Sequence, residues 1–306
     1  MIPEFSYNNK LYGLEKEFQE MISLYENNKL PNKILFSGLK GSGKCTFAYH
    51  LINYILSSFD IIKYDNKNFS INKESKTFKL IENGSNPNFS LIDIKPDKKS
   101  IDINQIRELI SKLNKSSFNN KPRFILIDNI EFLNVNSINA LLKILEEPNY
   151  NIFFILIHNN KKILSTLKSR CINFKISLSH EKSIKIANKI TNEDVNTLIN
   201  KDIMNYYLTP GDIVNIINFS KEYKLSLEEL NLELFLNILI NDKIYQKETS
   251  IKYLIFNFIE NFLRKNLERF STQNLNEFLK KIDRMKKFNL DEESFFIEFN
   301  SRILNG

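Results

Sequence analysis

The sequence contains only two cysteines, three histidines and no tryptophan in 306 residues. Two cysteines, Cys45 and Cys171, cannot form a disulfide framework or a four-cysteine zinc site, so we expect no zinc and a reducing compartment. No apolar run approaches transmembrane length, and the opening Met1-Ile2-Pro3-Glu4 lacks the basic-then-apolar pattern of a secretory leader. These absences predict a cytoplasmic protein without a membrane anchor.

Neither sign of charge dominates the chain. The 43 Lys and Arg against 36 Asp and Glu give a net charge of +7, which permits contact with nucleic acid without requiring it. The alternative is compositional, because Lys, Asn and Ile are abundant throughout, as expected from an AT-rich genome. The 25 Phe side chains are better explained as core filling than as platforms for stacked bases.

Glycine is also scarce, yet three of the seven glycines fall within six residues. Residues 38–45 read Gly-Leu-Lys-Gly-Ser-Gly-Lys-Cys and match the phosphate-binding pattern G-x-x-x-x-G-K-[S/T] except at Cys45. The apolar run Lys33–Ser37 predicts a buried parallel strand before this loop, and residues 46–56 have the apolar spacing of a helix after it.

This strand, loop and helix favour a phosphate-binding P-loop over a chance glycine turn. Together they direct backbone N–H groups and the helix dipole at an anion, and a lysine can reach the outer phosphates. We therefore predict a degenerate nucleotide or phosphate site. Its loop residues are Gly38, Gly41, Ser42, Gly43, Lys44, Cys45 and Thr46.

A second buried-strand pattern, Arg123–Asp128, ends in an acid that completes this site. In P-loop NTPases such an Asp holds Mg²⁺ through water, which assigns that position to Asp128. In related ATPases a Glu usually follows and activates the attacking water, but Asn129 cannot accept a proton. Glu131 would point elsewhere if the strand continued, so it receives no role.

Cys45 is the second departure from an active site. A Ser or Thr hydroxyl at this position ligates Mg²⁺, and a neutral thiol is a poor ligand for this oxygen-preferring cation. Thr46 follows one residue later, about 100° round the helix, and is no simple substitute. The two departures together argue against hydrolysis, whereas phosphate or nucleotide binding can survive because the glycines and Lys44 remain.

Two further stretches have a distinctive order of residues. Residues 136–148 read Asn-Ser-Ile-Asn-Ala-Leu-Leu-Lys-Ile-Leu-Glu-Glu-Pro, and residues 169–171 read Ser-Arg-Cys. Both resemble motifs of clamp-loader subunits of the AAA+ family, and the likeness extends over residues 8–176. The resemblance implies an α/β P-loop AAA+ domain, with a parallel sheet and flanking helices, at residues 1–176. It also implies a small helical lid at 177–222 and a C-terminal all-helical collar, which holds the subunits in a ring, at 223–306.

Within this family the chain most resembles delta-prime subunits of bacterial DNA polymerase III. Motor subunits of the gamma/tau type carry a cysteine-rich zinc module where residues 57–90 contain no cysteine. The stretch Thr209-Pro210-Gly211-Asp212 resembles one in which an Arg senses the gamma-phosphate, and here Asp212 stands in that place. The resemblance implies gamma/tau and delta subunits, a sliding clamp and primed DNA as partners, with ATP or ADP bound weakly or not turned over.

The same resemblance gives Arg170 a role. In the family, the arginine of the Ser-Arg-Cys motif acts in trans on the ATP of a neighbouring subunit. A guanidinium there stabilises charge on the transferred phosphoryl group. The alternative is an ordinary solvated arginine at a helix end. His158 and Asn159 end the strand expected at 152–157, where the family places a polar sensor, and we treat both as structural.

The remainder of the chain has helical patterns without a motif. Residues 181–222 contain two or three short helical patterns. Two apolar rows at four-residue spacing, one of them Leu254, Phe258 and Phe262, predict a helix buried within a bundle or against another subunit. The Asn, Lys and Ser content of residues 57–85 is typical of a mobile insert.

These patterns predict a largely hydrolysis-incompetent clamp-loader stator that helps to place a sliding clamp on primed DNA. Two alternatives remain. The first is an active ATPase motor that tolerates Cys45 and Asn129. The second is a P-loop small-molecule kinase, which the long helical tail and the Ser-Arg-Cys motif disfavour.

Overall fold

The computed structural model describes residues 8–95, 98–114, 119–147, 151–160, 163–270, 272–288 and 292–304. The chain divides into two compact units, Met1–Ser179 and His180–Gly306, and each is described by itself. The division into three domains, with a further boundary between residues 222 and 223, stays a prediction.

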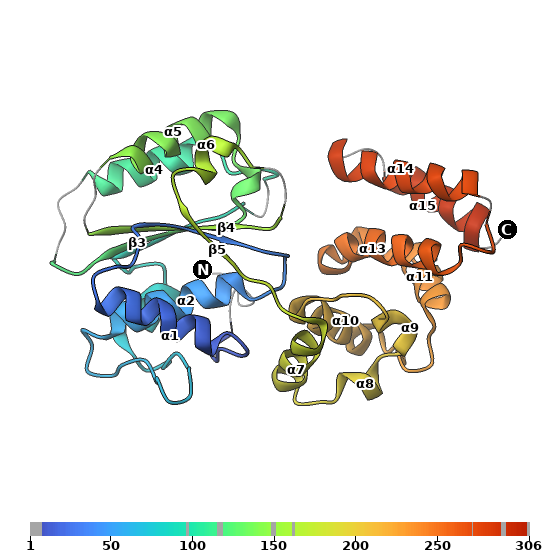
Figure 1. Ribbon diagram of the computed structural model, residues 1–306, viewed down its shortest axis with the longest axis horizontal. Helices are drawn as coiled ribbons and strands as arrows, with labels where there is room; N and C mark the ends of the chain where they lie inside the picture. The colour runs from blue at the N-terminus through green and yellow to red at the C-terminus, as the bar shows by residue number, and fades with distance from the viewer. Residues whose placement is uncertain are drawn as a thin grey trace. The chain divides into compact units, whose positions relative to one another are not determined.

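The first unit is built around a five-stranded parallel sheet (Figure 1). Every residue of the central strand, β4 (Ile152–His158), is buried. Such burial is expected for a parallel sheet that is covered on both faces. The spatial order is β2-β3-β4-β1-β5. The strands are β1 (Lys33–Ser37), β2 (Phe89–Ile92), β3 (Arg123–Ile127), β4 (Ile152–His158) and β5 (Ile172–Lys175).

Helices cover both faces of the sheet. In Figure 1, α1 and α2 lie on one face and α4, α5 and α6 on the other. The bounds are α1 (Glu15–Glu26), α2 (Lys44–Ser57), α3 (Lys76–Glu82), α4 (Ile103–Leu113), η1 (Ile130–Phe132, a 3-10 turn), α5 (Val135–Glu146) and α6 (Ser165–Lys168). This arrangement confirms the predicted α/β fold with a parallel sheet and flanking helices.

The order of the strands marks one place at the carboxyl edge of the sheet. From β1 the chain goes to β2 at one edge, and from β4 it goes to β5 at the other edge. Neighbouring strands whose connections diverge in this way leave a crevice at their carboxyl ends, where ligands of open α/β sheets bind. The P-loop follows β1 and therefore lies at this crevice.

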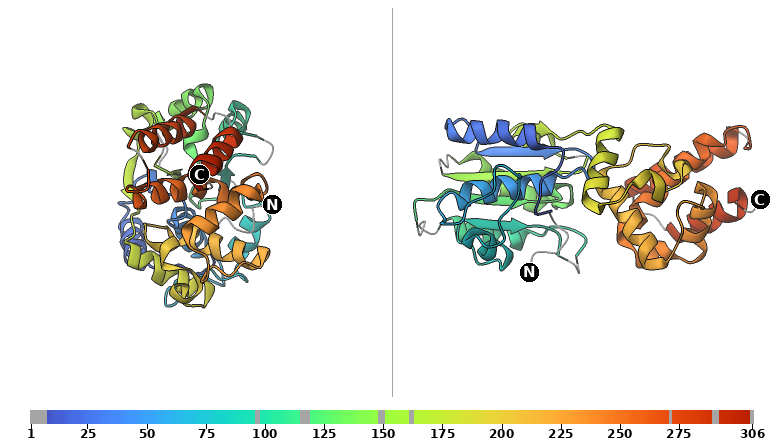
Figure 2. Two further views of the ribbon diagram at one scale, coloured as in Figure 1. Left: turned by 90° about the vertical axis from the view of Figure 1, so that its right-hand side faces the viewer. Right: turned by 90° about the horizontal axis from the view of Figure 1, so that it is seen from below.

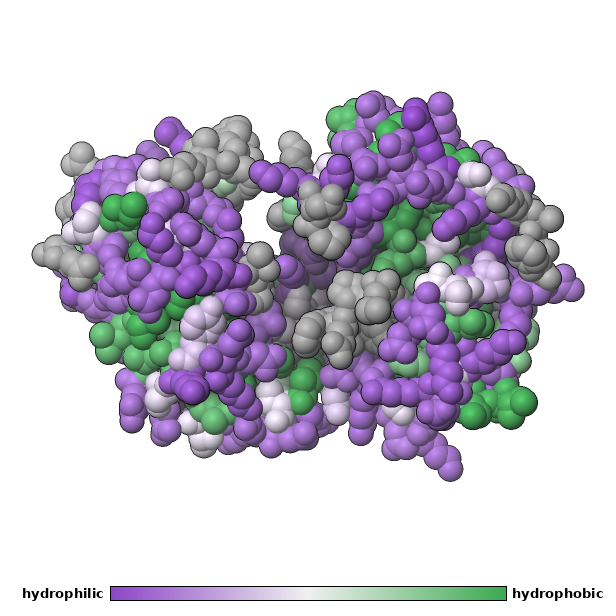
Figure 3. Space-filling model, turned by 180° about the vertical axis from the view of Figure 1, so that it is seen from behind, coloured by the Kyte–Doolittle hydropathy of each residue, from purple (hydrophilic) through white to green (hydrophobic). Residues whose placement is uncertain are grey.

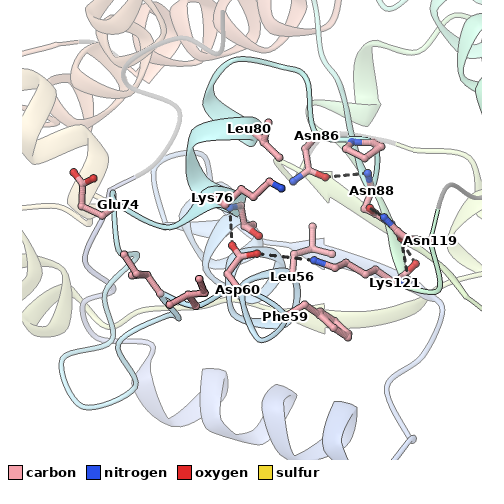
Figure 4. A pocket seen from close by; sticks show the side chains of 14 residues that line it. Leu56, Phe59, Asp60, Glu74, Lys76, Leu80, Asn86, Asn88, Asn119 and Lys121 are labelled. Atoms are coloured by element: carbon pink, nitrogen blue, oxygen red, sulfur yellow. Dashed lines mark hydrogen bonds and ion pairs between the residues drawn. The ribbon is translucent and has the colours of Figure 1, made fainter.

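Residues 57–85 are packed onto the first unit, contrary to the mobile insert that their composition suggests. Tyr64, Ile71, Phe78 and Ile81 are buried. The segment lines a pocket of about 440 Å³ together with Leu56, residues 86–88, Asn119 and Lys121 (Figure 4). These few buried apolar side chains, spaced among polar ones, anchor the segment, and its average composition does not reveal them.

The pocket is separate from the P-loop. It lies at the Leu56 end of α2, and the P-loop joins the other end of this 14-residue helix, about 20 Å away. Asp60 is its buried acid. The carboxylate accepts the backbone N–H of Thr77 at 2.7 Å and lies 3.9 Å from Lys121 Nζ (Figure 4).

The described residues of the second unit form helices joined by loops, with no strand among them (Figure 2). Its buried apolar side chains form one continuous core from Ala187 to Ile303. The helices are α7 (His180–Thr191), α8 (Val195–Leu198), α9 (Lys201–Met204), α10 (Pro210–Tyr223), α11 (Leu232–Asn241), α12 (Ile244–Lys247), α13 (Thr249–Lys265), α14 (Thr272–Phe288), α15 (Glu292–Phe299) and the π-helix η2 (Asn300–Leu304).

The two apolar rows of α13 are buried within this unit's own core. Six side chains at these positions are no more than 2% exposed: Leu254, Ile255, Phe258, Ile259, Phe262 and Leu263. Of the two environments predicted for this helix, the bundle interior is therefore the one that the structure shows.

The visible face in Figure 3 is mainly hydrophilic, with hydrophobic side chains in small groups. Large apolar side chains exposed on the first unit include Ile61, Val135 and Ile172. Among the described helices, none is long and apolar enough to cross a membrane.

Candidate functional site

The P-loop has a backbone that two of its glycines make possible. Gly43 is the N-cap of α2 and has a φ of 87°, in the left-handed region that a side chain disfavours. Gly38 lies close to Ile176, the residue that follows β5. A Cβ atom on Gly38 would be 2.2 Å from the carbonyl oxygen of Ile176. The first-turn N–H groups of α2 have no partners within the helix and face the loop, as an anion site requires.

Lys44 is folded back onto this loop. Its Nζ donates to the carbonyl oxygens of Gly38 at 3.0 Å and Leu39 at 2.5 Å. Desolvation by burial lowers the pKa of Lys44 to about 8, and the negative charges of Asp128 and Glu131 oppose that shift. A bound phosphate would replace these carbonyl partners with a stronger, charged one.

Cys45 and Asp128 meet across the site. The thiol of Cys45 lies beside the carboxylate of Asp128, and desolvation by burial, followed by that carboxylate's charge, holds the pKa of Cys45 well above its ordinary value. Burial, and then the charge of Asp93, raises the pKa of Asp128 to about 6. The structure therefore brings together the residues at the two positions where an active P-loop NTPase holds Mg²⁺, here as a thiol beside a carboxylate.

Asn129 joins three strand ends through its side-chain amide. Its Nδ2 donates to Asp93 Oδ1 at 2.8 Å, and its Oδ1 accepts from Asn159 Nδ2 at 2.9 Å. Asp93 follows β2 and Asn159 follows β4. An amide can donate on one side and accept on the other, which a carboxylate cannot do. Asn129 therefore acts as a bridge at the position where related ATPases carry their base.

Glu131 lies at the site, which the sequence reasoning missed. The expectation that it points elsewhere assumed a continuing strand, but β3 ends at Ile127 and the chain turns through Asn129, whose φ is 54°. Glu131 Oε2 accepts from the backbone N–H of Asn159 at 3.4 Å. Its Oε1 is buried and has no hydrogen-bond partner among the described residues.

Two other predicted residues have contacts of their own. The hydroxyl of Thr46 accepts the backbone N–H of Asn8 at 3.4 Å. In the second unit, Asp212 is 7% exposed and caps α10 through reciprocal bonds with Thr209 of 3.0 and 3.2 Å. The hydroxyl of Tyr253 also donates to the Asp212 carboxylate. Asp212 therefore has a structural role within its own unit.

Arg170 follows α6 and is held by groups from two helices. Nε donates to Glu146 Oε1 at 3.0 Å, Nη2 donates to the same oxygen, and Nη1 donates to the carbonyl oxygen of Thr166 at 2.8 Å. The Arg170 side chain remains 33% exposed. Leu167 and Cys171 are buried on either side of it along the chain. Pro148, which ends the motif containing Glu146, lies outside the described residues.

The donor set fits a phosphate better than a metal ion. Ser42 Oγ is buried without a hydrogen-bond partner among the described residues, and it lies beside the glycine cradle, 3.4 Å from the position of a Cβ on Gly38. Lys44 and the first turn of α2 supply positive charge. Among the described residues, no group of three or more His, Cys, Asp or Glu side chains is arranged to hold a metal ion. The cradle thus fits an anion, and the thiol of Cys45 stands where Mg²⁺ needs an oxygen.

Known proteins similar to this chain include subunits of DNA polymerase III. A delta' subunit from Buchnera aphidicola subsp. Schizaphis graminum is 32% identical over 170 residues, which are 55% of this chain and 50% of that protein. The delta' subunit of Bacillus subtilis is 31% identical over 147 residues, 48% of this chain and 42% of that protein. A gamma subunit from the same Buchnera is 30% identical over 176 residues, 57% of this chain and 46% of that protein. The chain spans about half the length of the curated relatives it matches.

A solved structure shares the fold. The gamma subunit-related protein of DNA polymerase III from Thermotoga maritima superposes with a TM-score of 0.51 and 17% identity, over 90% of this chain and 96% of that one. The sequence profile of the family described as "DNA polymerase III, delta subunit" matches residues 13–180, more than half of the chain. The chain therefore belongs to the DNA polymerase III, delta subunit family, and within it to the delta-prime relatives.

Proposed function

We propose that this chain is a clamp-loader subunit of the DNA polymerase III holoenzyme that turns over little or no ATP and acts as a stator. The observation that carries the proposal is the pairing of both hydrolytic positions with the chain's own acids. The side-chain amide of Asn129 donates to Asp93 at 2.8 Å, and the thiol of Cys45 lies beside the charge of Asp128. In this proposal these contacts take the place of metal positioning and water activation.

Arg170 would act on the ATP of a neighbouring subunit. Its guanidinium is partly exposed, and the buried residues Leu167 and Cys171 anchor its backbone. An arginine supplied in trans stabilises charge on the transferred phosphoryl group and is worth about 10³–10⁵ in rate in GTPases. The finger role is supported by the Ser-Arg-Cys motif and by this anchored, accessible position.

The proposal includes a set of partners. Gamma/tau and delta subunits would be its neighbours, and the assembled loader would place the sliding clamp on primed DNA in the cytoplasm. Contacts with DNA would be made to backbone phosphates and shared among the subunits. ATP or ADP would bind weakly to the glycine cradle and Lys44.

The finger role is tested in a loader reconstituted with gamma and delta subunits, clamp and primed DNA. Arg170→Ala should lower steady-state ATPase at least tenfold without dissociating the complex in size-exclusion chromatography. Arg107→Ala, which removes an exposed arginine of α4, is the matched control and should leave the rate unchanged. An unchanged rate for Arg170→Ala in an intact complex would remove the finger role.

Glu131 favours a second candidate function, an active motor. Its carboxylate has one buried oxygen without a hydrogen-bond partner among the described residues, and its charge acts on Lys44. ATPase turnover by the isolated chain that is abolished by Glu131→Gln would establish this alternative in place of the stator. The small-molecule kinase is set aside because the chain belongs to the DNA polymerase III, delta subunit family.

A further inference from the structure

Arg170 and Glu146 form a pair whose two members come from separate, anchored segments. Glu146 is the last residue of α5, and Leu145 immediately before it is buried. Arg170 lies between the buried residues Leu167 and Cys171. Because both backbones are fixed by their neighbours' burial, the pair can define the position of the guanidinium relative to the whole first unit.

The carboxylate of Glu146 is placed where it most needs a cation. The carbonyl end of a helix carries partial negative charge, so an acid in the last turn is unfavourable unless a cation neutralises it. Arg170 supplies that cation, with Nε and Nη2 both donating to Glu146 Oε1. The last turn of α5 and Glu146 therefore attract the guanidinium and orient its edge that carries Nε and Nη2.

The remaining donors of Arg170 are left for a second partner. A guanidinium has five N–H groups. Two donate to Glu146, and one on Nη1 donates to the carbonyl oxygen of Thr166. Two N–H groups, one on each terminal nitrogen, are therefore uncommitted in the contacts that the structure gives. The Arg170 side chain as a whole is 33% exposed, so an anion from outside the chain can approach it.

We propose that Glu146 is the positioning residue of the Arg170 finger: it holds one edge of the guanidinium while the remaining N–H groups meet a phosphate of the neighbouring subunit's ATP. This inference rests on the proposed trans role of Arg170. Displacement of a reacting or stabilising group by about 1 Å can cost a hundredfold in rate, so a side chain that fixes the finger acts on the chemical step without touching ATP.

The test compares three acid substitutions in the reconstituted loader. Glu146→Ala removes the acceptor and should lower the loader's kcat about tenfold, with the KM for ATP unchanged within about twofold, because the finger acts in the transition state. Glu146→Gln keeps an oxygen that accepts from Nε and should retain kcat within about threefold. Glu147→Ala removes the adjacent exposed acid and is the control that should behave as wild type.

A double substitution separates positioning from an independent role. If Glu146 acts through Arg170, then Glu146→Ala combined with Arg170→Ala should have the same kcat as Arg170→Ala alone. Additive losses would overturn the inference. A wild-type or raised kcat for Glu146→Ala, in a loader that Arg170→Ala does slow, would also overturn it and leave the finger role intact. No effect of Arg170→Ala itself would instead remove the proposed function.

Discussion

The side chain of Asn129 donates a hydrogen bond of 2.8 Å from Nδ2 to Oδ1 of Asp93. Asp93 follows β2 and Asn129 follows β3, so this bond ties together the carboxyl ends of two neighbouring strands. Asn159, at the end of β4, extends the tie to a third strand. Asn129, at the position that holds the catalytic base in related ATPases, here holds three strand ends together by hydrogen bonds.

Asn129→Glu should therefore destabilise the protein and should not create an ATPase. The glutamate would place a carboxylate against Asp93 and would lose the N–H donor that Asn129 gives to Asp93. It would also put a long side chain on a residue whose φ is 54°. The expected loss is about 1–3 kcal/mol of unfolding free energy, measured by urea denaturation. Asn129→Gly, which suits the same backbone and adds no charge, should lose less. Equal stability of the Glu variant and wild type would contradict this role of Asn129.

Cys45→Thr should make nucleotide binding dependent on Mg²⁺. The Cys45 thiol beside Asp128 is a poor ligand for Mg²⁺, whereas a hydroxyl at the start of α2 supplies the oxygen that the cation prefers. In fluorescence titrations with a labelled nucleotide, the wild type should bind equally with Mg²⁺ or a chelator. The variant should gain about tenfold, or about 1.4 kcal/mol, from Mg²⁺. A wild-type affinity that already falls tenfold with chelator would disprove the assignment.

Gly38→Ala should destabilise the first unit far more than Gly84→Ala does. A Cβ at Gly38 would lie 2.2 Å from the carbonyl oxygen of Ile176, but one at Gly84 meets nothing within 4 Å. Both glycines have positive φ, 154° at Gly38 and 66° at Gly84, and Gly84→Ala, at a cost of about 1 kcal/mol, shows what a side chain at positive φ costs where it meets no neighbour. Thermal unfolding should show a clearly larger loss at Gly38. Similar losses at both sites would mean that the loop can move away from Ile176.

His50 should make stability fall in acid. Its Nε2 lies 2.8 Å from the carbonyl oxygen of Asn8, which can only accept, so Nε2 carries the proton and Nδ1 accepts from the hydroxyl of Tyr64 at 2.7 Å. Burial lowers the pKa of His50 to about 4. The unfolded chain therefore binds more protons than the native protein between about pH 6.5 and pH 4, and stability is lost as pH falls through that range.

The effect is measured as a difference between two proteins. Asp128, whose pKa is raised to about 6, has the opposite effect on stability over nearly the same pH range. There the native state binds more protons than the unfolded chain at this group, so its contribution to stability increases as pH falls. His50→Gln keeps a donor and an acceptor without titrating. The stability advantage of wild type over His50→Gln should shrink by about 3 kcal/mol from pH 7 to pH 4. A difference that does not change with pH would show that His50 is not held neutral.

Much of the fold could be predicted from local pattern. The strand Lys33–Ser37 has the predicted bounds, and β3 and β4 begin at the predicted Arg123 and Ile152. Such runs are informative because a strand buried on both faces must be apolar throughout. The glycines of the P-loop were equally informative, since the turn at Gly43 and the close approach at Gly38 leave few alternatives.

The parts that sequence reasoning missed depend on contacts between distant segments. Glu131 reaches the site only because the chain leaves the strand direction at Asn129. The pair of Glu146 and Arg170 joins residues 24 apart, and no spacing rule indicates it. The packing of residues 57–85 depends on a few apolar side chains among polar ones, such as Phe78. Periodicity describes one element at a time and carries no information on which elements meet.

The central claim is that this chain contributes Arg170 to chemistry in another subunit. The most direct measurement is the single-turnover rate of ATP hydrolysis by the loader assembled with clamp and primed DNA, for wild type and for Arg170→Ala. We predict at least a tenfold slower chemical step for the variant, with unchanged ATP binding and an intact complex. Equal single-turnover rates in intact complexes would contradict the account and leave Arg170 as a surface arginine paired with Glu146.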